Sequence, residues 1–488
     1  MTHANRWLVH AIVSSALFLI VIDMTVLYTA LPTLTRDLAA TASEKLWILN
    51  AYSLVVAGLL PGFGTLGDRF GHRRMFVIGL VVFGIASSIA AFAPSPAVLI
   101  AARALLAVGA AAMMPATLSI IRLTFEDDDE RAFAIGIWAA VASGGAALGP
   151  VVGGLLLEYF WWGSVFLINV PIVIIALIAA LVLIPARAGH KGTPWDMFSS
   201  AQIMLGLVAL SWALKESATR QPDWGLVALA TVIGGAACTA FVRRQFRLRH
   251  PLIDLSLFGS RDFSAGVIGA LIAAMVIVGM ELALSQRLQL VLGLSPLQAA
   301  WFILPIPLGA FVGGPLAGRY LPRIGGMKML LTGFVLSLAG LILFLALLHG
   351  PKPVQIVALA LQGLGLGAAM TAASSTIMLS APRERAGMAA AVEEVSYELG
   401  GALGIAVLGS LMSFAYTLNM PDLPGIAAQA HDGLDEALMI AATLPERAAQ
   451  DLSDAARGAS DRAFVWVTLA AILITAALSA YLATRARR

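Results

Sequence analysis

The sequence predicts an all-α integral membrane protein whose fourteen transmembrane helices are arranged as six, two and six. Two observations predict this fold class. Of the 488 residues, 59% are hydrophobic and 12% are charged, whereas about 25% of the residues in a soluble domain are charged. In addition, one sequence pattern recurs at an offset of 254 residues, which indicates two related halves.

The spans are predicted from apolar runs that reach the roughly 20 residues a helix needs to cross a bilayer. Charged segments or segments rich in Pro and Gly separate these runs. We expect the spans at about residues 8–32, 46–66, 75–93, 97–121, 132–157, 162–184, 198–215, 224–242, 263–286, 296–318, 328–348, 354–380, 387–415 and 463–484.

The orientation follows from the basic residues. An even number of spans returns both termini to one side of the membrane. If that side is the cytoplasm, 21 of the 31 Lys and Arg residues lie in cytoplasmic segments, 9 lie outside and Arg103 lies within a helix. Cytoplasmic loops carry an excess of Lys and Arg, so we expect both termini in the cytoplasm.

The repeat rests on three matches. "GTLGDRFGHRRM" at 64–75 matches "GRYLPRIGGMKM" at 318–329, "ERA" at Glu130 recurs at Glu384, and "GAALG" at Gly145 recurs as "GGALG" at Gly400. We therefore expect three domains. They are an N-terminal six-helix bundle at 1–190, two inserted linker helices with a basic cytoplasmic link at 191–260, and a C-terminal six-helix bundle at 261–488.

An outer loop or helical hairpin is expected at 417–461, because "GLDEALMIAATLPERAAQDL" can form one or two amphipathic helices. This segment is either a solvated spacer or a gate over a cavity that faces outward.

Four motifs resemble those of a known family. "GTLGDRFGHRR" resembles the loop motif of the major facilitator superfamily, "LIAARALLAVGAAAM" its fourth-helix motif, and "GGAALGPVVGG" its fifth-helix antiporter motif. "VIDMTVLYTALP" is similar to the first-helix signature of the fourteen-helix drug:proton antiporters. Span thirteen contains three acids, Glu393, Glu394 and Glu398. Within that group, these acids make the chain most similar to exporters of quaternary ammonium compounds and methyl viologen.

The resemblance implies the major facilitator fold and a location in the bacterial inner membrane. It also implies proton-coupled multidrug efflux of lipophilic and quaternary ammonium cations such as biocides, dyes and methyl viologen-like compounds. An exporter of another class of small molecule, such as a siderophore, a sugar or a lipid, is the alternative.

Two charges fall deep within the first half of the chain. Asp23 lies in the middle of span one, and Arg103 lies in span four. Bare charges at such depth cost at least a few kcal/mol, so we expect them to face a cavity, a partner or both. A fixed structural ion pair is one interpretation; we favour a pair that takes part in proton coupling.

Three carboxylates, Glu393, Glu394 and Glu398, lie in span thirteen, where the repeat counterpart "WAAVASGG" contains no acid. Glu394 and Glu398 are four residues apart and share one helix face, whereas Glu393 is turned by about 100°. Adjacent carboxylates in a low dielectric cannot all ionise, so some hold protons until a cation arrives. We expect Glu394 and Glu398 to serve proton coupling and substrate binding. Glu393 either binds substrate or is solvated in an inner vestibule.

Further candidates for substrate binding are aromatic or polar, because cation–π attraction suits flat or quaternary cations. They are Trp47, Asn50, Tyr52 and Tyr397. Packing or lipid anchoring is the alternative for each of them. Glu281, near the outer end of span nine, is either an interfacial residue or a cation contact in an outer cavity.

The loop motif predicts a conformational latch. We expect Asp68 to face a neighbouring helix N-terminus, while Arg69, Arg73 and Arg74 hold the cytoplasmic surface or reach the acidic segment 126–130. The second copy has Pro322 in place of Asp68, which makes the latch one-sided. The candidate latch residues are Gly64, Asp68, Arg69, Gly71, Arg73, Arg74, Glu130 and Arg131.

The antiporter motif predicts close helix packing. Its small residues recur at a spacing that permits close helix contact, and its proline is expected to bend the helix. Its residues are Gly145, Gly149, Pro150, Gly153 and Gly154.

Other classes of function are disfavoured. All seven histidines are predicted in loops or at helix ends, so no haem or metal pair is expected within the membrane. The sequence contains no GxxxxGK[ST] phosphate-binding motif. We expect no enzymatic activity, no cofactor, no metal and no nucleic acid. The expected partners are cationic drugs, protons and the lipid bilayer, and the protein is expected to act as a monomer.

Overall fold

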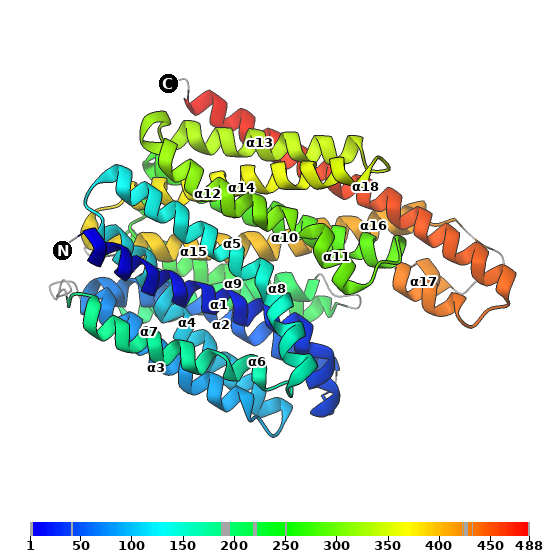
Figure 1. The fold of residues 1–488 in the computed structure, drawn as a ribbon, viewed down its shortest axis with the longest axis horizontal. Coiled ribbons are helices and arrows are strands. Elements are labelled where there is room, and N and C mark those ends of the chain that lie inside the picture. Colours follow the sequence, from blue (N-terminus) through cyan, green and yellow to red (C-terminus); the bar gives the residue numbers. More distant parts are fainter. Residues whose placement is uncertain are drawn as a thin grey trace.

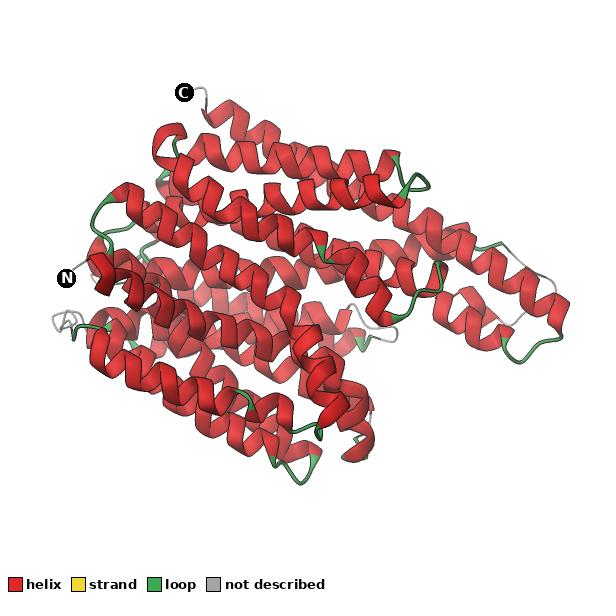
Figure 2. Cartoon of the chain, viewed as in Figure 1, coloured by secondary structure: helices red, strands yellow, loops and turns green. Residues whose placement is uncertain are grey.

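The computed structural model is helical throughout the part that it describes, residues 3–40, 42–186, 196–217, 222–248, 251–421, 423, 428–431 and 433–486 (Figures 1 and 2). Fourteen helical segments of that part are long and apolar enough to cross a membrane. The predicted all-α membrane fold with fourteen spans is therefore confirmed.

Both termini lie at the same end of the bundle (Figure 1). We call this the inner end, since the sequence predicts it to be cytoplasmic, and the opposite one the outer end. The first six spans occupy seven helices, because two short segments share the sixth span. They are α1 (His3–Asp37), α2 (Ala42–Phe70), α3 (His72–Ala91), α4 (Pro96–Thr124), α5 (Asp128–Tyr159), α6 (Ser164–Leu167) and α7 (Asn169–Leu183).

The inserted pair is α8 (Met197–Ser217) and α9 (Trp224–Gln245). The last six spans are interrupted by short 3-10 and π turns. Their elements are η1 (Leu255–Gly259), α10 (Arg261–Gln286), η2 (Arg287–Val291), α11 (Pro296–Ile303), α12 (Pro305–Ile324), α13 (Gly326–Ala346), α14 (Lys352–Ser380), η3 (Arg383–Arg385), α15 (Ala386–Leu403), η4 (Gly404–Leu408), α16 (Gly409–Asn419), η5 (Ala428–His431), α17 (Leu434–Ala441) and α18 (Glu446–Ala486).

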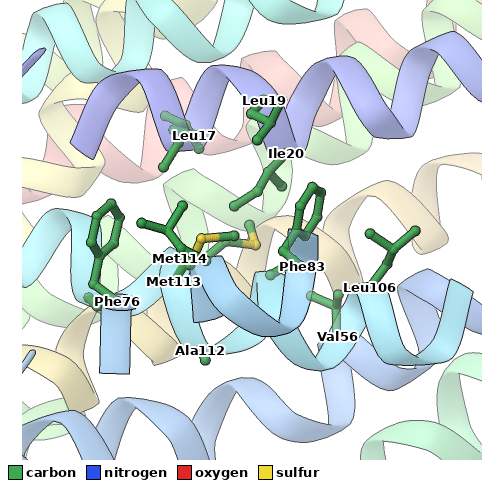
Figure 3. Packing of buried hydrophobic residues seen from close by; sticks show 14 of the residues in the cluster. Leu17, Leu19, Ile20, Val56, Phe76, Phe83, Leu106, Ala112, Met113 and Met114 are labelled. Carbon is green, nitrogen blue, oxygen red and sulfur yellow. The ribbon is translucent and has the colours of Figure 1, made fainter. Parts of the chain in front are cut away.

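The core of the first half is dry and closely packed. Phe76 and Phe83 of α3 lie against Met113 of α4 and against leucines of α1 (Figure 3). A Cβ on Gly79 would meet Met113, so the missing side chain lets α3 and α4 approach closely. This core fixes the helices that carry Asp23 and Arg103.

Two turns that reverse the chain at the inner end have the same backbone conformation at positions related by the repeat. Gly71 separates α2 from α3 with φ 96°, and Gly325 separates α12 from α13 with φ 86°. These two positions are 254 residues apart, which is the offset of the repeat. A positive φ favours glycine strongly. Both copies of the loop motif therefore turn at a glycine with positive φ.

The two halves meet at the inner end through contacts that follow the same offset. Gly64 of α2 lies so close to Gly387 of α15 that a Cβ would meet the Gly387 carbonyl oxygen. In the other half, Gly318 of α12 lies against Ala132 and Phe133 of α5 in the same way. Positions 64 and 318, and positions 133 and 387, are each 254 apart. The inner end is thus closed by two repeat-related crossings.

The inserted helices pack beside one of these crossings. Gly58 of α2 faces Met204 and Val208 of α8, and a cluster of α8, α9 and the following link reaches Val395 of α15. Gln245 of α9 accepts from the backbone N–H of Leu252 at 2.6 Å. The inserted pair of helices therefore packs against α2 and α15, the two helices that meet at the inner end. The predicted domain boundaries remain a prediction.

The outer segment contains two helices, as expected, but the second is continuous with the last span. The elements α17 and the first turns of α18 project beyond the other helices (Figure 1). Arg287 is buried and pairs with Asp461 of α18 at 2.6 Å, and the Tyr416 hydroxyl donates to the Ala430 carbonyl at 2.9 Å. These contacts tie the segment to η2 and α16. Whether it acts as a gate stays a prediction.

One histidine departs from expectation. His10 lies within α1, is 3% exposed, and its Nε2 is 2.8 Å from the carbonyl oxygen of Ala134. That backbone partner on α5 satisfies the buried ring. The expectation that every histidine lies in a loop or at a helix end was wrong for this residue, although it remains a packing residue.

The closed inner end should depend on the absence of a side chain at Gly64. Gly64→Ala places a Cβ against a carbonyl oxygen, and such overpacking costs about 1–3 kcal/mol, so the ratio of closed to open protein should fall by about 5- to 150-fold. Spin labels on Arg74→Cys and Arg323→Cys in a Cys238→Ser background would report the distance between the halves. Gly154→Ala is the matched control, because a Cβ there meets open space. An unchanged distance distribution in Gly64→Ala would contradict the argument.

Candidate functional site

A compensated ion pair lies at the centre of the first half. Asp23 of α1 and Arg103 of α4 are each 2% exposed, and Arg103 Nη1 donates to Asp23 Oδ2 at 2.9 Å. Asn169 at the start of α7 donates to the other carboxylate oxygen at 2.8 Å, and it also donates to Ser87 of α3 at 3.1 Å. Four helices therefore converge on one buried carboxylate.

Asn169 and Ser87 are absent from the sequence-based candidates. The signal was present, since Asn169 is a polar residue inside an apolar run, "FLINVP". Buried polar side chains require hydrogen-bond partners, so such a residue is a candidate partner for a buried charge. Asn169 holds Asp23 from the side opposite Arg103.

Tyr52 of α2 connects this pair to the second half. The Arg103 guanidinium lies over the Tyr52 ring at 4.6 Å, within the range of a cation–π interaction. Tyr52 is 1% exposed, and its buried hydroxyl has no hydrogen-bond partner in the described structure. The hydroxyl also lies within electrostatic range of Glu394 and Glu398. Tyr52 thus contacts Arg103 and also lies within electrostatic range of two acids of α15.

Two carboxylates of α15, Glu393 and Glu394, lack the compensation that Asp23 has. Glu393 and Glu394 are 0% and 4% exposed. Ser374 of α14 donates to Glu393 Oε1, while Glu393 Oε2 and Glu394 Oε1 are buried without a partner in the part of the chain that is described. Neither residue forms an ion pair there. The alternative that Glu393 is solvated in an inner vestibule is wrong for this conformation, because α14 covers it.

The three acids lie on two faces of α15, as predicted. Glu393 accepts from Ser374 of α14, whereas Glu394 and the half-buried Glu398 lie within electrostatic range of Tyr52 of the first half. Tyr397 lies on the α14 side, with its hydroxyl 3.5 Å from Ser374 Oγ and 3.4 Å from the Met370 carbonyl oxygen. The helix therefore presents one acid with a tyrosine to its own half and two acids to the other half.

The remaining pocket candidates are not all brought together. Trp47 is 45% exposed near the outer end of α2, and Asn50 is half-buried one turn further along. Glu281 lies near the outer end of α10, where it lines a separate pocket. The structure therefore gathers Tyr52, Glu394, Glu398 and the pair Asp23–Arg103, and leaves Glu281 apart.

The inner end carries the expected contact of Asp68. Its two carboxylate oxygens accept from the backbone N–H groups of Gly387 and Met388, at 2.8 and 3.0 Å. These groups open α15, and a carboxylate at a helix N-terminus is favourable. His72 Nε2 lies 3.3 Å from the same carboxylate.

A second contact at this helix start is new. Arg385, which precedes α15, pairs with Asp254 of the link at 2.6 Å. Through Gln245 and Asp254, the inserted helices are connected to the helix end that Asp68 holds. Sequence reasoning missed Asp254 because no local pattern pairs it with a residue so distant in the chain.

Two basic residues of the loop motif contact other groups than the acidic segment in the described structure. Arg73 donates instead to the Leu181 carbonyl of α7 at 2.5 Å, and Arg69 lies over the Phe70 ring. The acids pair elsewhere, Glu130 with Arg6 at 2.6 Å and Asp128 with Arg131. Of the two expected alternatives, Arg73 does not take the contact with the acidic segment, because its position on α3 directs it to α7.

The antiporter motif packs α5 against α1. A Cβ on Gly149 would overlap Thr25, and one on Gly145 would crowd Val21 and Phe18. Gly154 faces open space, so close packing was a wrong expectation there: the outer end of α5 lies away from α1. The side chain of Pro150 lies outside the described residues.

Comparison with known proteins agrees with this architecture. Residues 13–405 match the Major Facilitator Superfamily. The chain is 38% identical over 469 residues to the methyl viologen resistance protein SmvA of Salmonella typhimurium, covering 95% of this chain and 94% of that protein. It is 37% identical over 495 residues to the multidrug efflux pump LfrA of Mycolicibacterium smegmatis, covering 100% and 97%.

Solved structures show the same fold at low identity. The human organic anion transporter MFSD10 is similar with a TM-score of 0.62 at 15% identity, covering 96% of this chain and 99% of that one. The E. coli fucose:proton symporter FucP is similar with a TM-score of 0.58 at 12% identity, covering 97% and 98%. The predicted family is confirmed. With bacterial relatives along nearly its whole length and fourteen spans, this chain belongs to the Major Facilitator Superfamily and is a multi-pass membrane transporter, not an enzyme.

Proposed function

We propose that this transporter exports lipophilic and quaternary ammonium cations, including biocides, dyes and methyl viologen-like compounds, in exchange for protons across the bacterial inner membrane. The observation that carries the proposal is the burial of Glu393 and Glu394 without a basic partner in the described structure. Relatives named for methyl viologen resistance and multidrug efflux support the substrate class.

The acids of α15 favour cationic cargo for an electrostatic reason. An ionised carboxylate in a low dielectric is stable only with a compensating charge. A proton or a cationic drug can supply that charge, and the two exclude one another at a given oxygen. A lipophilic cation also removes its apolar surface from water. An anionic cargo would meet repulsion from the same groups.

Proton coupling requires acids that change their protonation during the cycle. Asp23 is neutralised by Arg103 in the present conformation, and its protonation would leave the Arg103 charge uncompensated. Tyr52 contacts Arg103 and lies within electrostatic range of Glu394 and Glu398, so we expect that change of charge to alter the electrostatic potential at these acids. We assign Asp23, Arg103, Glu394 and Glu398 to this coupling.

The contact of Asp68 with α15 fits a latch for the conformation closed at the inner end. Helix α15 carries both the latched N-terminus and the acids two turns further on. Release of the latch would therefore move the acids together with the inner end. On this proposal, one helix serves both cargo binding and conformational change.

Transport itself tests the proposal. Exchange of one proton for one monovalent cation moves no net charge, whereas two or more protons per cation also use the membrane potential, about 2.3 kcal/mol per charge per 100 mV. In proteoliposomes with an imposed pH gradient we expect export of ethidium and benzalkonium but not of an uncharged drug, accelerated by an imposed potential. Absence of cation transport would overturn the function; indifference to the potential would overturn the two-proton coupling.

Replacement of the acids of α15 should change the pH dependence of binding. The ionised form binds cations, so wild-type affinity should rise with pH and weaken as pH falls. Glu394→Gln with Glu398→Gln should lower affinity for a lipophilic cation by about tenfold or more, ~1.4 kcal/mol, and flatten this dependence. Titration calorimetry across pH would measure it. The exposed Glu158→Gln is the control, and wild-type pH dependence in the double variant would remove these acids from the mechanism.

Asp68→Asn should impair cycling more than binding. Asparagine has a single acceptor oxygen, so it can serve the N–H of Gly387 or of Met388 but not both, and it lacks the charge that suits a helix N-terminus. Loss of a charge-assisted hydrogen bond costs about 1.5–3 kcal/mol, enough to lower transport by about tenfold or more.

Drug affinity, measured by titration, should change much less than transport. The exposed Asp37→Asn at the outer end of α1 is the matched control. An equal loss of affinity and transport in Asp68→Asn would count against the latch.

A further inference from the structure

A second carboxylate pocket lies between the halves near the outer end. It has a volume of about 370 Å³ and is lined by α1, α5, α10, α11 and the start of α12. Thr25 and Val151 contribute from the first half, and Glu281, Ser285 and Trp301 contribute from the second. A cavity of this size is in the range that holds drug-sized ligands.

Glu281 is the acidic residue among the described lining residues of this pocket, and its charge is not compensated. Its carboxylate forms no hydrogen bond or ion pair in the described structure, and the effect of its surroundings on this carboxylate is desolvation by burial. Arg287, the next basic residue along the chain, is instead paired with Asp461 and lies over the Phe464 ring at 5.4 Å. A carboxylate half-buried at this depth, with a cavity in front of it, calls for a cationic ligand.

The pocket is separate from the acids of α15. Helices α10 and α15 run parallel in a fixed register, since Gly400 lies against Leu271 and Gly404 against Met275. Continued along both helices, this register places Glu281 level with Ser410. That is twelve residues beyond Glu398, or about 18 Å along the axis at 1.5 Å per residue.

The walls indicate which cation fits. Most of the lining is apolar, with Trp301 and Val151 beside Glu281, and Gln289 already donates to Ser285 at 2.9 Å. One carboxylate among apolar and aromatic walls matches a lipophilic cation with one charge, because a small hydrated ion would lose water without enough oxygen ligands.

We propose that this pocket is a second, outer binding site for lipophilic monocations, in which Glu281 supplies the charge and Trp301 an aromatic wall. The proposal rests on the proposed function for its place in export, where the site holds the cation after it leaves the acids of α15. The closed inner end and the outer position of the pocket suit this order.

The test asks whether a cation occupies the pocket, independently of transport. In a Cys238→Ser background, Ser285→Cys places a reactive thiol in the pocket, and Ser453→Cys on α18 serves as a thiol outside it. Tetraphenylphosphonium should slow alkylation of the thiol at position 285 by a membrane-impermeant maleimide and leave that at position 453 unaffected. Glu281→Gln should raise the concentration for half-protection at least tenfold, while Glu281→Asp should retain protection.

The acids of α15 separate the two proposals. Glu394→Gln with Glu398→Gln should leave protection at position 285 intact, even if cation transport is lost. The outer site is overturned if wild-type protein shows no protection, if protection survives Glu281→Gln unchanged, or if the α15 variant alone abolishes it. Failure of cation transport with retained protection would instead overturn the proposed export and keep the site.

Discussion

Desolvation of charge is the constraint on which the rest of this structure depends. A carboxylate inside a membrane bundle is stable only if something compensates it, and the two halves differ in how they do so. In the first half, Arg103 and Asn169 bind both oxygens of Asp23. In the second half, Glu393 receives one hydroxyl from Ser374, and one oxygen of Glu394 receives nothing in the described structure. The first arrangement is complete without cargo, and the second is not.

This asymmetry is superimposed on a backbone that is nearly symmetric. The crossings of Gly64 with Gly387 and of Gly318 with Phe133 follow the repeat offset, as do the two glycine turns. Symmetric small-residue contacts let either crossing close tightly, because backbone meets backbone. An acid of the loop motif, Asp68, reinforces the first crossing in the described structure, whereas Pro322 stands at the equivalent position of the second. The link after the inserted helices also stabilises the first crossing, through the ion pair between Asp254 and Arg385. Stability at the inner end is therefore concentrated on α2 and α15.

The sequence was sufficient where the evidence is local. Fourteen spans follow from apolar length, and the depth of Asp23 and Arg103 in their helices already implied a partner. The repeat aligned the two loop motifs, in which the structure places both glycine turns. Sequence was insufficient where the outcome depends on the rotation of one helix against another. Arg73 contacts α7 rather than the acidic segment, and Gly154 faces open space. Glu393 is covered by α14 rather than solvated, because the register of α14 against α15 cannot be inferred from either helix alone.

The placement of Tyr52 explains how two differently compensated sites can coexist so near to one another. If Arg103 reached Glu394 directly, an ion pair would form, and a cationic substrate would have to displace a guanidinium. Arg103 is instead engaged by Asp23 and by the Tyr52 ring, which lies at 4.6 Å from the guanidinium and within electrostatic range of Glu394. Glu394 forms no ion pair in the described structure, and a neutral ring in a low dielectric screens the field of the guanidinium little. On the proposed mechanism, this arrangement keeps Glu394 available to cargo while leaving it responsive to the protonation of Asp23.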